Sequence, residues 1–360
     1  MKLDVQNPIG VQNDINLAES NSRRKRDHLR INLTQDVQFD TISTGLDDYR
    51  FVHQALPELD AGTIDLSVSL FGKALRAPLL LSPMTGGIRQ AQRINHNLAR
   101  AAQALGIAMG VGSQRTAIDN PRVRNTFQVR DVAPDILLLA NLGAVQLNYG
   151  YGPEECKRAV EMIKADALML HLNPLHEALQ PEGQTNFSGL LRKIEQVCRQ
   201  LSVPVVVKEV GWGISEAVAR KLAGVGVAGL DVAGAGGTSW GKVERHRANN
   251  NNPNKLAERF AHWGIPTAES IKMARCGAPD VTLIASGGIR TGLDVAKAIA
   301  LGAHAAGIAA PMLRAANVSD KAVIESMNEI IEGLRITMFC IGAASISELK
   351  DSPFLEKIRK

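Results

Sequence analysis

Residues 204–240 read PVVVKEVGWGISEAVARKLAGVGVAGLDVAGAGGTSW. The run PVVVKEV at 204–210 is almost wholly apolar, and so is GLDVAG at 229–234. Between them, SEAVARKLAGV at 215–225 has the apolar spacing of a helix with one buried face. An apolar strand, a helix and a second apolar strand form the unit from which parallel sheets covered by helices are built.

The same unit recurs along the chain. Further helical patterns are INHNLARAAQAL (94–105), EECKRAVEMIKA (154–165), SGLLRKIEQVCRQL (188–201) and LDVAKAIALG (293–302). Further apolar runs are PLLLS (78–82), GIAMGV (106–111), DILLLA (135–140), ALMLH (167–171), VTLIAS (281–286) and AAGIAA (305–310). Eight strand–helix units favour a closed (β/α)8 TIM barrel, an α/β fold in one domain, over an open doubly wound sheet.

Segments outside the repeat suggest the domain boundaries. We expect an N-terminal extension over residues 1–40, the barrel over 41–345 and a C-terminal tail over 346–360. Between the sixth and seventh strands lies an insertion, SWGKVERHRANNNNPNKLAERFAHWGIP, at 239–266. Its asparagine run cannot build a core, so residues 241–256 are predicted to form a mobile lid over the barrel mouth.

Composition excludes several classes of protein. Apolar residues make up 45% of the 360 and charged residues 21%, which is typical of a soluble globular protein. The net charge of +5 is mild, and only RRKR at 23–26 is a basic cluster. This run could be a nucleic-acid or localisation patch, but no second basic cluster and no interleaved aromatic residues extend it. A small anionic substrate, and no nucleic acid, is therefore expected.

Targeting and redox signals are also weak. The N-terminus is polar, which argues against a secretory signal, and no apolar run reaches the length of about 18 residues that spans a membrane. The cysteines are Cys156, Cys198, Cys276 and Cys340, and they form no CxxC pair. The sequence therefore indicates neither a zinc site nor a disulfide framework, and a reducing cytoplasm is expected.

Polar and glycine-rich segments follow the apolar runs, where active sites of this fold lie. The fourth run is followed by HLNPLHEALQPEG, which begins at 171 and packs histidines, amides and carboxylates together. SGGIRTGLDVAKA at 286–298 combines a glycine turn with a helix start, a favourable cradle for a phosphate. A GG-x-R turn by itself is weak evidence, because many tight turns share it.

Lys208 lies within the fifth apolar run, after three valines. An ammonium group is costly to bury unless it is paired with negative charge, which a flavin anion or a phosphate would supply. Alternatively, the lysine extends its ammonium group to solvent or caps a helix. Because it occurs on the same predicted face as Asn141, Thr238 and the phosphate loop, we favour a cofactor contact.

Short motifs follow one another from Arg24 to Pro311: RKRDH (24–28), HQALPE (53–58), MTGG (84–87), GSQR (112–115), HLNPLHE (171–177), VKEVGWG (207–213), DVAGAGGTSW (231–240), WGIPTA (263–268) and SGGIRTGLDVAKAIALGA (286–303). Together they resemble the type 2 isopentenyl-diphosphate isomerases, a family of flavin-dependent barrel enzymes. The resemblance implies reversible 1,3-allylic isomerisation of isopentenyl diphosphate to dimethylallyl diphosphate in isoprenoid biosynthesis. It also implies reduced FMN without net redox change, NADPH or another reductant, Mg2+, and a homo-oligomer, a tetramer or an octamer.

The resemblance also implies roles for single residues. The diphosphate would meet Arg24 and Lys25, with Ser113, Gln114 and Arg115 close by. Arginine and lysine suit this ligand because forked and point donors match its charge. FMN would be held by Met84, Thr85, Gly86, Ser113, Asn141, Lys208, Thr238, Gly288, Ile289, Arg290, Ala309 and Ala310.

The HLNPLHE segment would form the substrate side of the site. The resemblance makes His171, Asn173 and His176 catalytic or substrate-contacting groups, and Glu177 the Mg2+ ligand. A single carboxylate is enough, because Mg2+ takes most ligands from phosphate and water. The family pattern is usually NxxQE, so His176 stands where a glutamine is usual. A neutral imidazole offers one donor and one acceptor and could orient the substrate as glutamine does.

Other functions are distinguishable by sequence. An FMN-dependent 2-hydroxy-acid oxidase would carry an SNHGGR-like segment near the seventh strand, and a nucleoside-monophosphate dehydrogenase would carry a cysteine in the loops after the central strands; neither is found. A non-catalytic phosphometabolite-binding barrel would need the phosphate loops but not the convergence of His171, Asn173, His176 and Glu177.

Overall fold

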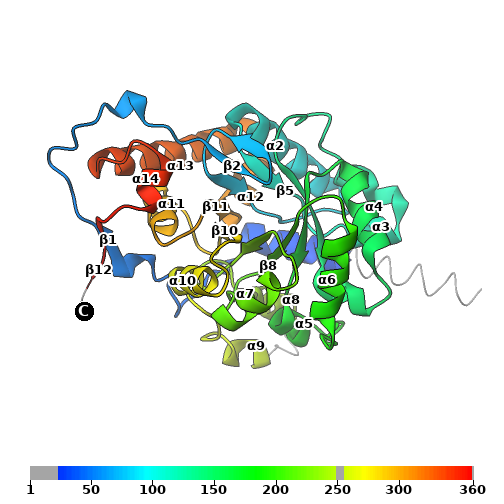
Figure 1. The fold of residues 1–360 in the computed structure, drawn as a ribbon. Helices are drawn as coiled ribbons and strands as arrows, with labels where there is room; N and C mark the ends of the chain where they lie inside the picture. Colours follow the sequence, from blue (N-terminus) through cyan, green and yellow to red (C-terminus); the bar gives the residue numbers. More distant parts are fainter. Residues whose placement is uncertain (1–22, 249–254, 359–360) are drawn as a thin grey trace, which may run out of the picture.

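A computed structural model describes residues 23–248 and 255–358. Its centre is a closed barrel of eight parallel strands, which confirms the predicted fold (Figure 1). Each strand overlaps a predicted apolar run, and the third extends furthest beyond its run, to Gly143. The strands are β4 (Leu79–Leu81), β5 (Ala108–Gly110), β6 (Leu138–Gly143), β7 (Ala167–His171), β8 (Val205–Lys208), β9 (Gly229–Asp231), β10 (Thr282–Ala285) and β11 (Ala305–Ile308).

Helices cover the outside of the barrel (Figure 1). Every helix predicted from an apolar pattern is present, because one face of each buries its apolar residues against the strands. The longer helices are α2 (Arg89–Leu105), α4 (Pro153–Ile163), α6 (Leu190–Gln200), α7 (Glu216–Ala223), α8 (Trp240–Arg247), α10 (Thr267–Gly277), α11 (Gly292–Ala300), α12 (Ala310–Val318) and α13 (Asp320–Cys340). The short ones are α3 (Arg115–Asp119), α5 (Pro174–Leu179), α9 (Lys255–Arg259), α14 (Ile346–Lys350), η1 (Leu46–Asp48), η2 (Ala61–Thr63), η3 (Pro121–Thr126) and η4 (Ala144–Asn148). No helix of the described ranges is long and apolar enough to cross a membrane.

A hairpin closes the amino end of the barrel. It consists of β2 (Val68–Leu70) and β3 (Lys73–Leu75), joined by a two-residue turn. Phe71 and Gly72 both have positive φ, 50° and 80°, as in the tight hairpin turn that matches strand twist. Leu70 and Phe71 pack on inward-facing residues of the barrel, among them Met169 and Val206. The barrel interior at its amino end is therefore an apolar core.

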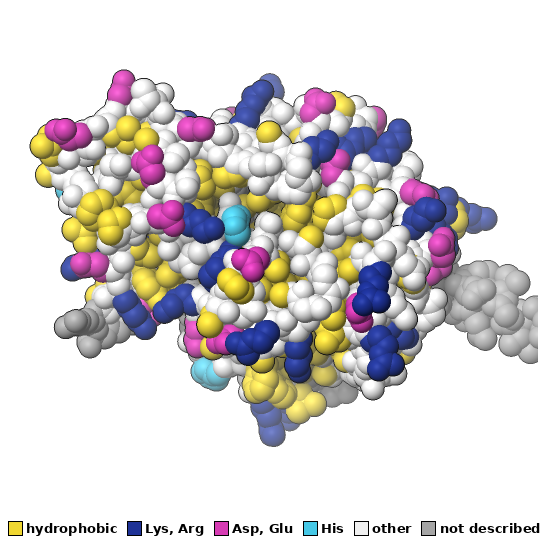
Figure 2. Space-filling model, viewed as in Figure 1, with side chains coloured by type: hydrophobic (Ala, Val, Ile, Leu, Met, Phe, Trp, Pro, Cys, Tyr) yellow, Lys and Arg dark blue, Asp and Glu magenta, His cyan; other side chains and the backbone are white. Residues whose placement is uncertain are grey.

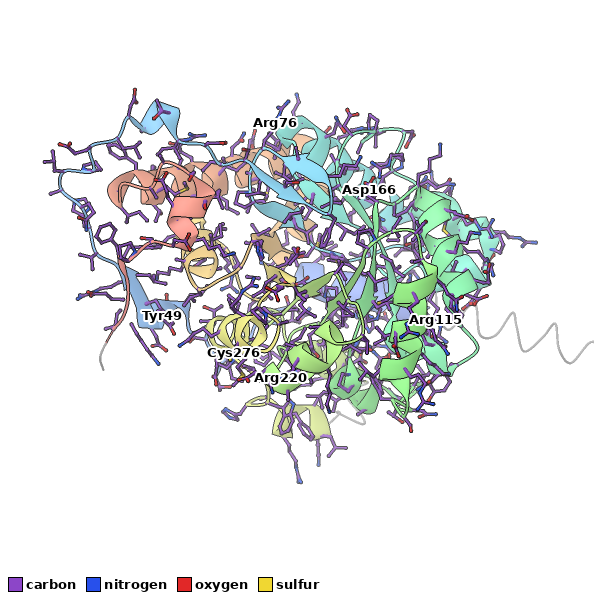
Figure 3. The ribbon with its side chains drawn as sticks, in the orientation of Figure 1. Tyr49, Arg76, Arg115, Asp166, Arg220 and Cys276 are labelled. Atoms are coloured by element: carbon purple, nitrogen blue, oxygen red, sulfur yellow. The ribbon has the colours of Figure 1, made fainter. Side chains whose placement is uncertain are left out.

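Two arginines hold the loops at this end. Arg130 donates hydrogen bonds to the carbonyls of Ala133, Pro134 and Ile136 at 3.0–3.2 Å and to the carbonyl of Lys164. It also contacts Asp166, labelled in Figure 3, whose Oδ2 lies 2.8 Å from Arg130 Nη2 and 2.9 Å from the N–H of Leu138. One side chain thus joins the loops that enter β6 and β7.

Arg275 repeats this arrangement on the other half of the barrel. It donates to the carbonyls of Ala278, Pro279, Val281 and Gly302, and contacts His304 Nδ1. His304 Nδ1 accepts from the N–H of Leu283 at 2.9 Å, as Asp166 accepts from Leu138. The shared sequence is R-x-x-A-P-D, at 130–135 and at 275–280, and it leads into strands four places apart in the barrel.

The chain ends pack onto the barrel. Residues 23–34 form a helix, and the segment after it is tied to the loop that follows β9, because Ser239 N–H donates to Val37 O and Phe39 N–H donates to Gly237 O. At the other end, β12 (Leu355–Lys357) pairs with β1 (Tyr49–Phe51), at the left of Figure 1. The expected boundaries at residues 40 and 345 stay predictions, since residues 1–22 and 359–360 lie outside the described part.

The insertion between β9 and β10 is partly folded. Its first half is α8, whose Val243 and Glu244 are buried. At α8 the structure has a helix where a loop was expected, because these side chains pack against the N-terminal helix and α5, while the mobility of residues 241–256 stays a prediction. The asparagine run falls within 249–254, outside the described residues, and the lid stays a prediction there.

Candidate active site

A cavity of about 400 Å3 opens at the carboxyl ends of the barrel strands. Loops after all eight strands and the helix over 23–34 line it. Its size lies within the range of small-molecule sites. The lining includes these residues singled out in the sequence: Arg24, Lys25, Met84, Thr85, Gly86, Ser113, Arg115, Asn141, His171, Asn173, His176, Glu177, Lys208, Thr238, Gly288, Ile289, Arg290, Ala309 and Ala310.

Gln114 is the exception, and its expected substrate contact needs correction. The side chain is fully buried behind the cavity wall. Its amide group donates to Ala159 O at 2.9 Å, and its Oε1 accepts the N–H of Asn141 at 2.9 Å. Ser113, Gln114 and Arg115 follow β5, and the side chain of Gln114 points to the opposite side from its two neighbours. Ser113 and Arg115 therefore line the cavity, while Gln114 joins β6 to α4.

The floor of the cavity is a row of polar residues. Strand register places His171 beside Lys208, and Lys208 beside Asp231. His171 Nδ1 lies 2.8 Å from Asn141 Oδ1, an acceptor, so Nδ1 carries the hydrogen and Nε2 is the acceptor. Burial, with the nearby charge of Lys208, lowers the pKa of His171 to about 3. His171 is therefore a neutral imidazole at physiological pH.

Lys208 lies beside a buried carboxyl group. Its buried side chain lines the cavity, and Asp231, its neighbour in strand register, is fully buried. Burial raises the pKa of Asp231, opposed by the charge of Lys208 and by the hydroxyl of Ser286, which donates to Oδ1 at 2.6 Å. Asp231 Oδ2 has no hydrogen-bond partner in the described part of the chain. Because burial disfavours the ionised form of Asp231, an anionic ligand in the cavity is a favourable partner for Lys208.

Three cations gather at one wall: Arg24, Lys25 and Arg115, the last labelled in Figure 3. Lys25 Nζ donates to Ser113 O at 3.1 Å and to Thr116 Oγ1 at 2.8 Å. Burial, followed by the charges of Arg24 and Arg115, lowers the pKa of Lys25 to about 7. Burial and Arg115 likewise lower the pKa of Arg24. Like charges held together in a buried wall favour binding of an anion.

Oxygen atoms face the cavity near these cations. Glu177 Oε1 accepts from the Asn173 amide at 2.8 Å, and Oε2 accepts the N–H of Gln184 at 2.6 Å. Asn173 Oδ1 is buried without a hydrogen-bond partner in the described residues. A carboxylate beside an unpaired amide oxygen is a donor set that suits Mg2+.

Close backbone packing forms the opposite wall. A Cβ atom on Gly237 would lie 2.4 Å from Gly288 N, so the two glycine loops meet without side chains between them. The next loop leads into α12, and no side chain of the described residues caps this helix at Ala309. The first N–H groups of a helix have no partner within it and attract anions. This wall therefore suits a phosphate.

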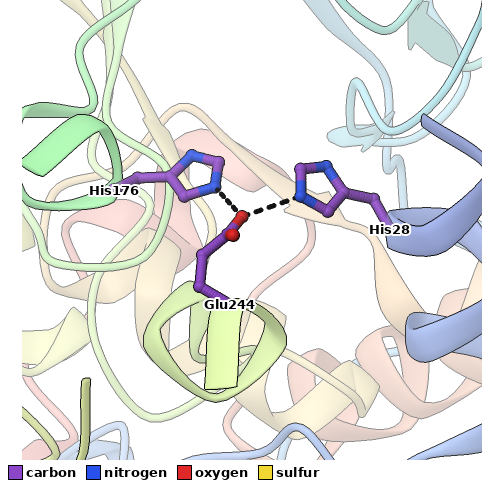
Figure 4. Close-up of side chains that lie close together, drawn as sticks. All are labelled: His28, His176 and Glu244. Atoms are coloured by element: carbon purple, nitrogen blue, oxygen red, sulfur yellow. Dashed lines mark hydrogen bonds and ion pairs between the residues drawn. The ribbon is translucent and has the colours of Figure 1, made fainter. Parts of the chain in front are cut away.

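Sequence analysis missed three residues at the site: His28, Trp240 and Glu244. Glu244 belongs to α8, and its side chain is only 2% exposed. Its Oε1 lies 2.7 Å from His28 Nε2 and 3.0 Å from His176 Nε2 (Figure 4). Burial would raise the pKa of Glu244, but its hydrogen bonds with the two histidines hold it far below the usual range. The spacing of Trp240 and Glu244, one helical turn apart after AGAGGTSW, was the available signal.

Known proteins share this sequence and fold. A model of the FMN-dependent dehydrogenase family matches residues 19–123 and 158–356. The isopentenyl-diphosphate delta-isomerase of Nostoc sp. is 54% identical over 336 residues, covering 93% of this chain and 96% of the relative. That of Rickettsia typhi is 52% identical over 335 residues, covering 92% and 98%.

Solved structures of similar shape share the barrel alone, because their sequence identity is low. A lactate oxidase of Pediococcus acidilactici has a TM-score of 0.64 at 16% identity, covering 100% of this chain and 97% of its own. A flavocytochrome b2 variant with pyruvate bound has a TM-score of 0.66 at 17% identity, covering 91% and 82%.

The barrel, its cavity and the family match define an FMN-dependent α/β barrel enzyme. Within this class, the two relatives that are more than 50% identical to this chain are isomerases, whereas the oxidase and the flavocytochrome are under 20% identical to it. The chain belongs to the isopentenyl-diphosphate delta-isomerase family, in its type 2, FMN-dependent form.

Proposed function

We propose that this enzyme interconverts isopentenyl and dimethylallyl diphosphate by a 1,3-allylic proton shift that requires reduced FMN and Mg2+. The observation that carries the proposal is one cavity with two separate anion-binding walls: the glycine loops with the start of α12, and the cations Arg24, Lys25 and Arg115. One wall suits the phosphate of a cofactor, and the other suits the diphosphate of a substrate.

The residues present fit FMN. Gly288, Ile289, Ala309 and Ala310 would hold its phosphate through backbone N–H groups, in a wall where Gly237 approaches Gly288 without a side chain between them. Lys208 would contact the ring, with Met84, Thr85, Gly86, Ser113, Asn141, Thr238 and Arg290 completing the site. When bound in its reduced form, FMN supplies a group that exchanges a proton with the substrate carbon.

The opposite wall would bind the diphosphate. Arg24, Lys25 and Arg115 offer N–H donors, and a bound dianion would raise the lowered pKa of Lys25, so that its ammonium form is kept. Glu177 and the unpaired Asn173 Oδ1 would hold Mg2+ against diphosphate oxygens. Each of these groups already lines the cavity, so binding needs little rearrangement.

His171 and His176 would position the hydrocarbon end of the substrate. His171, neutral and fixed by Asn141, offers Nε2 as an acceptor only. His176 packs against Trp240, with ring centroids 4.6 Å apart, which limits its rotation. The N-terminal helix and α8 cover this side of the cavity and would exclude water from a reactive intermediate.

We further propose, from the family resemblance, that NADPH serves as the reductant, that the enzyme acts in the cytoplasm as a homo-oligomer, a tetramer or an octamer, and that the asparagine run acts as a lid. Analytical ultracentrifugation would test the assembly. Amide hydrogen exchange over residues 241–256, measured with and without substrate, would test the lid. Exchange in this segment is expected to slow only when substrate binds to the reduced enzyme.

Proton NMR in D2O under nitrogen tests the reaction. Isopentenyl diphosphate is added to protein reconstituted with FMN and Mg2+, before and after reduction by dithionite or NADPH. We expect dimethylallyl diphosphate, with deuterium incorporated, only after reduction. Equal turnover with oxidised flavin, or turnover without flavin, would refute the proposal. Conversion of a 2-hydroxy acid instead would indicate an oxidase.

A further inference from the structure

A second cluster of potential ligands lies in the cavity wall, apart from the oxygen atoms of Glu177 and Asn173. His28 comes from the N-terminal helix, His176 from α5 and Glu244 from α8 (Figure 4). One ligand atom from each lies within 4.8 Å of the others. Both imidazole Nε2 atoms point at the same carboxylate oxygen, at 2.7 and 3.0 Å.

In the ion-free arrangement, a proton on each Nε2 is donated to the same oxygen of Glu244. Gln180 lies beside His176, with its amide group in contact with His176 Nε2 and its Oε1 3.4 Å from Arg24 Nη1. When both imidazoles are neutral with the proton on Nδ1, the same three atoms present lone pairs that can bind a cation.

A cation bound between the three ligand atoms would take the place of the protons on the two imidazoles, and Gln180 would turn its amide oxygen toward the site. We propose that His28 Nε2, His176 Nε2 and Glu244 Oε1 bind one divalent transition-metal ion with the ligand preference of Zn2+. Two imidazoles and a carboxylate are a common zinc set, with bonds of about 2.0–2.2 Å and an open fourth position. Tetrahedral bonds of that length separate ligand atoms by about 3.3 Å, so the two nitrogen–oxygen distances of 2.7 and 3.0 Å need only a small expansion.

The surroundings hold the ligands in this orientation. Arg247 Nη1 contacts the second carboxylate oxygen of Glu244 at 2.9 Å, leaving Oε1 for the ion. Trp240 packs against both imidazoles, with ring centroids 5.2 Å from His28 and 4.6 Å from His176. Such outer contacts fix ring orientation and contribute to metal affinity. Mg2+ prefers oxygen ligands, so the cluster is chemically distinct from the site proposed at Glu177.

Zinc binding to the full-length, FMN-loaded protein tests the proposal, without substrate and therefore independently of isomerase activity. The protein is freed of metal, its thiols are alkylated, and Zn2+ is titrated against a chromophoric chelator in excess Mg2+. We expect one Zn2+ per chain. His176→Gln and His28→Gln should each weaken this binding by at least about 100-fold, since each removes a ligand.

The matched control is His246→Gln, which removes an exposed imidazole from the same helix as Glu244 and should leave the affinity unchanged. Circular dichroism and flavin content establish that each variant is folded. The two ligand variants change different helices, so each tests the metal site separately. The proposal is overturned if the thiol-blocked protein binds no Zn2+, or if both ligand variants bind it as tightly as the parent.

Discussion

At the amino end of the barrel, Arg130 and Arg275 donate to backbone carbonyls in the loops that enter the strands. At the carboxyl end, Arg24, Lys25 and Arg115 lie together with lowered pKa values for Arg24 and Lys25, and buried oxygens of Asn173 and Asp231 lack partners in the described chain. The amino end of the barrel therefore pairs its arginines with carbonyls and a carboxylate, whereas the carboxyl end holds neighbouring cations that repel one another. Stability is expected to depend on the first arrangement, and binding of an anion on the second.

The largest effect is expected at the amino end. Arg130→Ala removes the donor of several carbonyls and one of the partners of Asp166, which keeps the N–H of Leu138 and the ammonium group of Lys73, and should lower the free energy of unfolding by about 3 kcal/mol. Urea unfolding measures this loss, while kcat/KM of the folded fraction should be unchanged. Arg275→Ala is the matched variant, with a smaller loss expected because its side-chain partner is His304 and not a carboxylate. Loss of activity at full stability would contradict the division between the two ends.

Lys25→Met is the corresponding change at the carboxyl end. It removes a charge-assisted contact with the diphosphate of about 1.5–3 kcal/mol, so KM should rise about 10- to 100-fold. Because burial and two neighbouring cations lower the pKa of Lys25 to about 7, the thermal midpoint should stay equal or rise. Initial rates and calorimetry measure both quantities. A lower midpoint with unchanged KM would make Lys25 a structural residue.

A pH dependence is expected from His304. Burial, with the charges of Lys350 and Arg275, lowers its pKa from 6.5 to about 4. As the pH falls, His304 is therefore protonated in the unfolded state at a higher pH than in the folded state. Stability that is present above pH 6.5 is lost as the pH falls from 6.5 toward 4. Solvent screening of this partly exposed group limits the loss to about 1 kcal/mol. His304→Gln should flatten urea-midpoint profiles over this interval, and an unchanged profile would exclude His304 as the cause.

The smallest effect concerns Ala233, which lines the cavity with a positive φ of 37°. A left-handed conformation costs a residue with a Cβ roughly 1–2 kcal/mol, and glycine avoids that cost but loses more entropy on folding. Ala233→Gly should therefore raise the unfolding free energy by about 0.5 kcal/mol. Calorimetry checks this value. A destabilised variant would show that the loop after β9 is not strained.

Sequence patterns predicted much of this arrangement, for physical reasons. Buried parallel strands need continuous apolar residues, and active sites of barrels lie at strand ends, so the strands and the lining of the cavity could be located. The direction of one side chain in a turn depends on tertiary contacts, which is why Gln114 was misplaced. Glu244 was missed because it lies in a polar insertion, where its spacing from Trp240 was the only sign of a buried helix face. Arg130 and Arg275 were missed although their R-x-x-A-P-D motif is repeated in the sequence.

A crystal structure of the enzyme with FMN, Mg2+ and isopentenyl diphosphate tests the division between the two ends most directly. The account predicts the FMN phosphate against residues 288–290 and the start of α12, and the diphosphate against Arg24, Lys25 and Arg115. Either ligand bound outside this cavity, or a diphosphate turned away from these three cations, would contradict it.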